Sequence, residues 1–135
     1  MSLRIACAAL AGGLALADPA QAKTHWGSIY MAHPSGYYGT SRGQASPAAA
    51  RKEAAHTCNR QQHGFCREEI TYSETCAAVA VRREMRLVKG SYAATGDTPR
   101  QARLAALKIC SDTAKAAGKF FTGCEAVAST CARPR

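Results

Sequence analysis

The sequence predicts an α+β domain made of two copies of one β-β-α-β unit, at about residues 24–75 and 76–135. Two observations lead to this prediction. Residues 46–58 align with residues 98–110 at a constant offset, with proline on proline near each start and cysteine on cysteine at each end. Each of these two cysteines is then followed by two more. We expect one pseudo-twofold domain with an antiparallel sheet and two helices, held together by disulfides.

Before the repeats, the N-terminus has the three parts of a secretory signal peptide. A basic residue precedes an uncharged run over residues 5–17, and the small residues at 20–22 suit a cleavage site. The run is shorter than the roughly 18 apolar residues of a membrane span. We therefore expect residues 1–22 to be a signal peptide cleaved after Ala22. Residues 23–135 would then form a single periplasmic or secreted domain, with no stable membrane insertion.

In the first unit, residues 26–31 and 37–41 carry Trp, Ile and Tyr around a Pro-Ser-Gly break, which is typical of a hairpin. Ser46 suits an N-cap, and Pro47 suits the first helical position because its missing N–H has no partner there. Alanines spaced four residues apart then lead to a cysteine on one helix face. A polar segment ends the helix, and a strand is expected over residues 66–72.

In the second unit, strands are expected over residues 76–81 and 85–94, joined through residues 82–84. Thr98 and Gln101 then match a capping box, in which each side chain accepts a hydrogen bond from a backbone N–H near the other. The final strand is expected over residues 124–130.

The second helix shows a buried stripe at helical spacing and ends near Gly118. The expected stripe consists of Ala102, Ala105, Ala106, Ile109 and Cys110, widened by Leu104 and Leu107. If the copies fold alike, each gives a small sheet with one helix on a face. We expect the copies to pair edge to edge and extend that sheet into a thin two-layer domain.

The cysteines indicate oxidised crosslinks. Of the seven, Cys7 would leave with the signal, and six remain in a chain bound for an oxidising space. No pair has the C-x-x-C spacing of structural zinc, so we expect neither a metal nor another cofactor. Equivalent cysteines should make equivalent bonds in the two copies. The expected pairs are Cys58–Cys66, Cys110–Cys124 and, across the two halves, Cys76–Cys131.

The chain resembles a bacterial family of small exported proteins catalogued as a domain of unknown function, number 4189. The features that carry the resemblance are Trp26-Gly27, Gly39, Cys58, Cys110 and residues 76–80. The second hairpin, residues 86–94, departs from the Gly- and Trp-rich pattern of that family. The resemblance implies the fold and an exported location, and it implies no catalytic residues.

Candidate catalytic groups are few. Adjacent strand residues point to opposite faces, so Glu68 and Glu69 cannot both face one substrate. No serine lies in a G-x-S-x-G elbow, and the cysteines of the mature chain are expected to be paired. The remaining enzymatic alternative is a small enzyme that uses His56 and His63 with a nearby glutamate. We expect a protein without catalytic activity.

Positive charge is the strongest functional signal, with a net formal charge of +9. Nucleic acid is not expected as a partner, because aromatic platforms are not interleaved with the charge and the protein is exported. The expected partner-binding residues lie in the two hairpins: Arg82, Arg83, Arg86, Lys89, Tyr37 and Tyr38.

These observations favour a binding module that recognises an acidic partner protein, as a periplasmic inhibitor or immunity-type protein would. An alternative is a cell-envelope or surface protein held electrostatically on anionic polymers. The sequence leaves the oligomeric state open.

Overall fold

A computed structural model describes residues 23–61, 65–119 and 123–134. The expected signal peptide and His63 lie outside the described residues. The elements run in the order β1 (Trp26–Ala32), β2 (Tyr38–Gln44), α1 (Pro47–Gln61), β3 (Cys66–Ser73), β4 (Cys76–Glu84), β5 (Leu87–Gly96), α2 (Pro99–Ala116) and β6 (Cys124–Cys131). In the described part of the chain, no helix is long and apolar enough to cross a membrane.

The two copies have the same topology. Each forms a three-stranded antiparallel sheet with its first strand in the centre, in the orders β2-β1-β3 and β5-β4-β6. Pairing of the first and third strands is interrupted by an irregularity at equivalent places, between Ile29 and Tyr30 and between Val79 and Ala80. The predicted duplicated α+β fold is confirmed.

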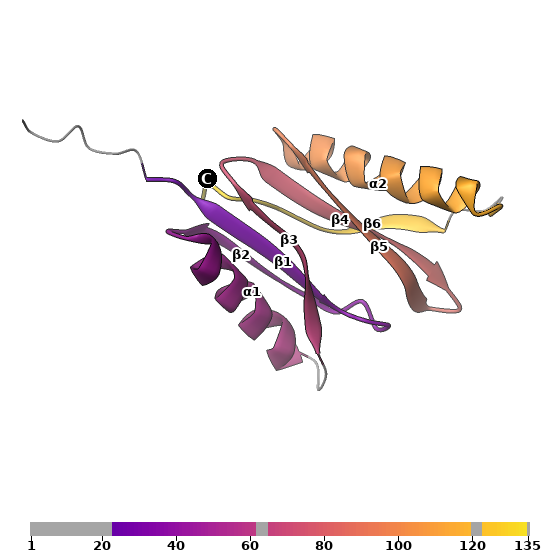
Figure 1. The fold of residues 1–135 in the computed structure, drawn as a ribbon, viewed down its shortest axis with the longest axis horizontal. Coiled ribbons are helices and arrows are strands. Elements are labelled where there is room, and N and C mark those ends of the chain that lie inside the picture. The colour runs from indigo at the N-terminus through magenta and orange to yellow at the C-terminus, as the bar shows by residue number, and fades with distance from the viewer. Residues whose placement is uncertain (1–22, 62–64, 120–122, 135) are drawn as a thin grey trace, which may run out of the picture.

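The copies join face to face, so the expected edge-to-edge extension of one sheet was wrong. Figure 1 shows four layers, with α1 and α2 on the outside and the two sheets between them. One buried cluster contains side chains from both sheets and therefore lies between them. Its members are Ile29, Met31, Tyr72, Ala77, Val79, Val81, Val88, Ala128 and Ala132.

The sequence of β4 explains this arrangement. Val79 and Val81 face the other sheet, whereas Ala78 and Ala80 face α2 and pack with its buried residues. Successive strand residues point to opposite faces, so the alternation gives β4 two buried faces, one with larger side chains and one with smaller ones. Valines fill the space between the sheets. Alanines let the helix lie close on the outer face.

Small residues bring both helices close to the sheets. The equivalent residues Ala54 and Ala106 are fully buried, as the repeat predicts. A Cβ added to Gly39 in β2 would lie 2.3 Å from the backbone nitrogen of Cys58 and 2.4 Å from the carbonyl oxygen of Ala54. Gly96 in β5 approaches α2 in the same way, with Ala102 N 2.6 Å from the added atom.

The second helix begins where the sequence predicts it, with one change in its capping. Gln101 N donates to Thr98 Oγ1 over 3.1 Å, whereas Gln101 Oε1 accepts from the backbone N–H of Asp97. The expected buried stripe was wrong at Ile109, which is 43 % exposed, and Leu104 is exposed beside it. The alanine face of α2 packs so closely on the sheet that these larger side chains lie outside the contact between helix and sheet.

The expected turn at residues 82–84 was wrong, because β4 continues through Glu84. Glu84 pairs with Leu87, so the loop contains only Met85 and Arg86. Their φ angles of 51° and 70° are those of a two-residue hairpin turn. Such turns usually carry glycine or asparagine, and neither residue is present to mark this one in the sequence.

The disulfides are Cys58–Cys66, Cys110–Cys124 and Cys76–Cys131, the same pairs as the repeat predicts. The first two tie equivalent helix ends to the third strands. Cys76 and Cys131 instead face each other on neighbouring strands of the second sheet, so this bond does not cross the two halves as expected. Three disulfides indicate an oxidising compartment outside the cytoplasm.

Substituting Gly39→Ala tests the close contact between α1 and β2. The added methyl group meets helix backbone that cannot rotate away, so we expect unfolding free energy to fall by about 3 kcal/mol. Gly118→Ala is the control, since Gly118 has a φ of 77° but open space around it. This control should cost about 1 kcal/mol. Equal losses in denaturant unfolding would contradict the account.

Candidate functional site

The turns of the two hairpins lie together at one end of the sandwich (Figure 1). The backbone N–H of Val88 donates to the carbonyl of Pro34 over 2.8 Å. Arg83 Nη1 donates to the carbonyl of Ser35 over 3.3 Å, and its Nε lies 2.8 Å from Glu125 Oε1. The Arg83 side chain is therefore occupied by contacts that link the first hairpin turn to the second repeat.

The other predicted cations differ in how far they are neutralised. Arg82 pairs with Glu84, and Lys119 Nζ lies 3.5 Å from the same carboxylate. Hydrogen bonding from Arg82, with the nearby charge of Lys119, holds the pKa of Glu84 below its ordinary value. Arg86 and Lys89 are exposed and have no ion pair with any residue that the structure describes.

Apolar and aromatic side chains are exposed at the same end. Met85 is 95 % exposed at the hairpin tip, and Leu87 beside it is 43 % exposed. Tyr37 and Tyr38 are exposed next to the first hairpin turn. We call the set Arg86, Lys89, Met85, Leu87, Tyr37 and Tyr38 the basic tip. Sequence reasoning missed Met85, because its exposure depends on the position of the turn.

A polar cluster on the β3/β5 side contains a serine, a histidine and a carboxylate. His33 Nε2 lies 2.7 Å from Glu69 Oε1, and Ser91 Oγ lies 2.9 Å from both Glu69 oxygens. Ser91 Oγ is also 3.3 Å from the same His33 nitrogen. In a catalytic triad the carboxylate and the serine meet opposite nitrogens of the imidazole. Here they share one, so the serine donates to the carboxylate and the cluster acts as a clamp between repeats.

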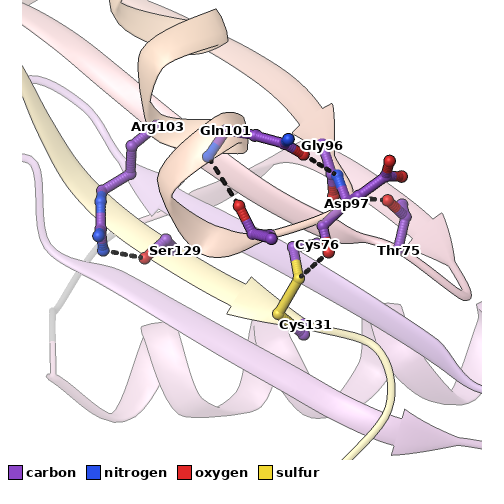
Figure 2. The surroundings of a disulfide bond; sticks show 9 residues. Thr75, Cys76, Gly96, Asp97, Gln101, Arg103, Ser129 and Cys131 are labelled. Atoms are coloured by element: carbon purple, nitrogen blue, oxygen red, sulfur yellow. Dashed lines mark hydrogen bonds between the residues drawn. A yellow bond between two sulfur atoms is a disulfide. The ribbon is translucent and has the colours of Figure 1, made fainter.

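A groove follows the other side, where the edge strands β2 and β6 lie near each other. It consists of open hollows that share lining residues. The shared residues, in order along the groove, are Cys131 and Arg133, then Arg42, Ser129 and Thr130, then Gln44 and Glu53. The Cys76–Cys131 disulfide lies at one end, where Figure 2 shows it beside Asp97. His56 of α1 lines the other end.

Of the predicted enzymatic residues, His63 lies outside the described residues, and His56 lines a hollow with Glu53 rather than with Glu68 or Glu69. Glu68 bonds to Arg51 and Thr71, away from the hollow that His56 lines. Among the residues in the three described segments, no three side chains of His, Cys, Asp or Glu gather in a group that could hold a metal ion.

Tyr72 crosses from β3 over β1 towards the groove. A Cβ added to Gly27 would lie 2.6 Å from the tyrosine ring and hydroxyl, so only glycine leaves room for it. The Tyr72 hydroxyl is buried without a hydrogen bond of normal geometry. Burial raises the pKa of Tyr72 to about 12, against a lowering by the neighbouring Thr130 hydroxyl.

Comparison with known proteins gives one result. A family model described as a domain of unknown function (DUF4189) matches residues 26–131. No curated protein and no solved structure matches the chain.

Substituting Tyr72→Phe tests the environment of this hydroxyl. Removing a buried group without a partner should raise the unfolding free energy by about 1 kcal/mol at neutral pH. The raised pKa favours neutral tyrosine in the fold. The resulting contribution to the stability of the fold is present below pH about 10 and is lost as the pH rises towards about 12.

The variant should therefore lose less stability than the native protein between these pH values. Tyr38→Phe, at an exposed position, is the control. Denaturant unfolding at neutral and alkaline pH measures both effects. A Tyr72→Phe protein that is less stable at neutral pH would show that the hydroxyl has a partner.

Proposed function

Because the chain belongs to a family described only as a domain of unknown function (DUF4189), we propose its role from the structure. It is an exported, disulfide-stabilised binding module that recognises an acidic partner protein and catalyses no reaction. The observation that carries this proposal is the basic tip. There, Met85 is almost fully exposed beside Arg86 and Lys89, two cations without a counterion among the described residues.

The chemistry of the basic tip suits a protein partner. Exposed apolar side chains next to unpaired cations combine an anchor that is buried on binding with charges that attract and orient the partner. Methionine adapts its shape to an uneven surface, which makes it suitable for such an anchor. A polymer recognised by charge alone would give no reason for Met85 and Leu87 to be exposed here.

The tip is also rigid, which favours specific recognition. Arg83 fixes the first hairpin turn against the second repeat, and the hydrogen bond from Val88 to Pro34 fixes the backbone. A surface held in its binding conformation loses little conformational entropy when the partner docks. Inhibitors and immunity-type proteins, which block a toxin or hydrolase, work in this way, and we propose that role.

The location follows from the same chemistry. The disulfides need an oxidising compartment, and the N-terminal pattern of residues 1–22 is that of a signal peptide cleaved after Ala22. We propose that the mature protein works in the periplasm or is secreted.

The test is capture of periplasmic proteins on immobilised native protein and on Arg86→Glu/Lys89→Glu. We expect the native protein to retain a partner with an acidic isoelectric point, and the double variant to lose it. The control is Lys52→Glu/Arg100→Glu, which makes the same change in net charge at two exposed helix residues. The control should retain the partner.

The salt dependence separates this proposal from electrostatic association with envelope polymers. A protein partner anchored by Met85 should stay bound at moderate ionic strength, and Met85→Ala should weaken binding by about 1 to 2 kcal/mol. If both double variants lose binding equally, or if the protein sediments with isolated cell envelope at low salt only, the polymer alternative is correct.

A further inference from the structure

We propose that the hollow between β2 and β6 is a second binding site, specific for an oxyanion group such as a carboxylate, sulfate or phosphate. It is lined by Arg42 from β2, by Ser129, Thr130 and Cys131 from β6, by Arg133 and by Pro99 of α2. No carboxylate lines this hollow, although Glu53 lines the hollow on one side and Glu74 and Asp97 line the hollow on the other. Guanidinium and hydroxyl groups are the donors that oxyanions take in proteins.

Backbone contacts bring the two arginines together. The N–H of Gly43 donates to the carbonyl of Ala132 over 2.8 Å, and Pro134 lies against Gly43. Arg42 and Arg133 each adjoin one of these contacts in sequence, so the crossing of β2 by the C-terminal segment places both at one hollow. Two like charges brought to one place repel each other, and a bound anion relieves that repulsion.

Both cations keep donor groups available for a ligand. Arg133 bonds through Nε to Glu74, which also accepts a hydrogen bond from the backbone N–H of His25. These hydrogen bonds hold the pKa of Glu74 below its ordinary value, and the bond from His25 has the larger effect. Arg42 has no side-chain partner among the residues described in the structure.

The Ser129 hydroxyl is oriented to donate into the hollow. Arg103 Nη1 donates to Ser129 Oγ over 3.1 Å, and Figure 2 shows it reaching from α2 down to β6. Ser129 thus accepts from the helix side and keeps its own proton for a ligand. Behind Thr130 lies the buried Tyr72 hydroxyl, a donor without a normal partner. The Thr130 hydroxyl lines the hollow beside it.

The helix α2 adds to the positive potential at the hollow, because the hollow touches Pro99, the first residue of this long helix. The partial positive charge at a helix N-terminus attracts anions. The site is separate from the basic tip. Arg82 pairs with Cys124 at the tip end of the second sheet, whereas Cys131 pairs with Cys76 at the opposite end.

The experiment is a titration of the intact protein with sodium sulfate, sodium phosphate and an acetylated hexaglutamate peptide, followed by backbone amide NMR. Chloride is kept constant. We expect saturable shifts centred on the amides of Arg42, Ser129 and Thr130. Arg42→Gln should weaken binding by about ten-fold or more, because a charged hydrogen bond is lost. Arg67→Gln, an exposed edge-strand arginine without a described partner, should leave binding unchanged.

Ser129→Ala keeps every charge and should weaken binding by a smaller factor than Arg42→Gln. Preference for sulfate or phosphate identifies a sulfated or phosphorylated ligand, and preference for the peptide identifies carboxylates of a protein. Either preference supports the site. Shifts spread over all exposed cations, or equal losses in Arg42→Gln and Arg67→Gln, would overturn it. Because the site is separate, Arg86→Glu/Lys89→Glu should bind these ions normally.

Discussion

The packing of the two sheets against each other is the constraint on which the rest of the molecule depends. Each repeat alone has a helix on one face of its sheet and an apolar face left over. Ile29 and Met31 of the first repeat and Val79 and Val81 of the second fill the space between those faces. Burying each such side chain contributes about 1.5 to 3 kcal/mol. Neither repeat has another surface that could bury them, so the repeats stabilise each other.

This packing creates two unlike sides. On the β3/β5 side, Glu69 accepts from Ser91 of the other repeat and from His33 of its own, and these part-buried hydrogen bonds close the gap between the repeats. On the β2/β6 side, a groove runs along the edge strands and is lined by arginines and hydroxyl groups. The proposed functions follow from this asymmetry. The closed side and Arg83 keep the basic tip rigid, and the open side leaves polar groups available for an anion.

The disulfides reinforce the layers rather than the joint between repeats. Cys58–Cys66 and Cys110–Cys124 each hold a helix on its own sheet, and Cys76–Cys131 holds two strands of the second sheet. At equivalent register, the first sheet has Trp26 opposite Ser73, so the third bond has no counterpart there. The contact between the two repeats is therefore noncovalent apart from the chain itself.

The local features could be predicted from the sequence, whereas those that depend on tertiary packing could not. The helix starts, the order of strands and helices along the chain and the cysteine pairs could be predicted, because caps, periodicity and the repeat express them locally. The face-to-face packing could not, since an Ala/Val alternation such as that in β4 suits two buried faces but does not say which partner covers each. The groove and the clamp were missed for the same reason. Arg42 and Arg133, or His33 and Ser91, meet only once the sheets have packed.

Native-state hydrogen exchange tests most directly whether the two repeats form one cooperative unit. We expect the amides of Ile29 and Val79, at the centres of the two sheets, to exchange with the same free energy, equal to that of global unfolding. Their free energies should also fall together as denaturant is added. Exchange at Ile29 with a clearly lower free energy, while Val79 stays protected, would show that the second repeat is stable without the first and would contradict the account.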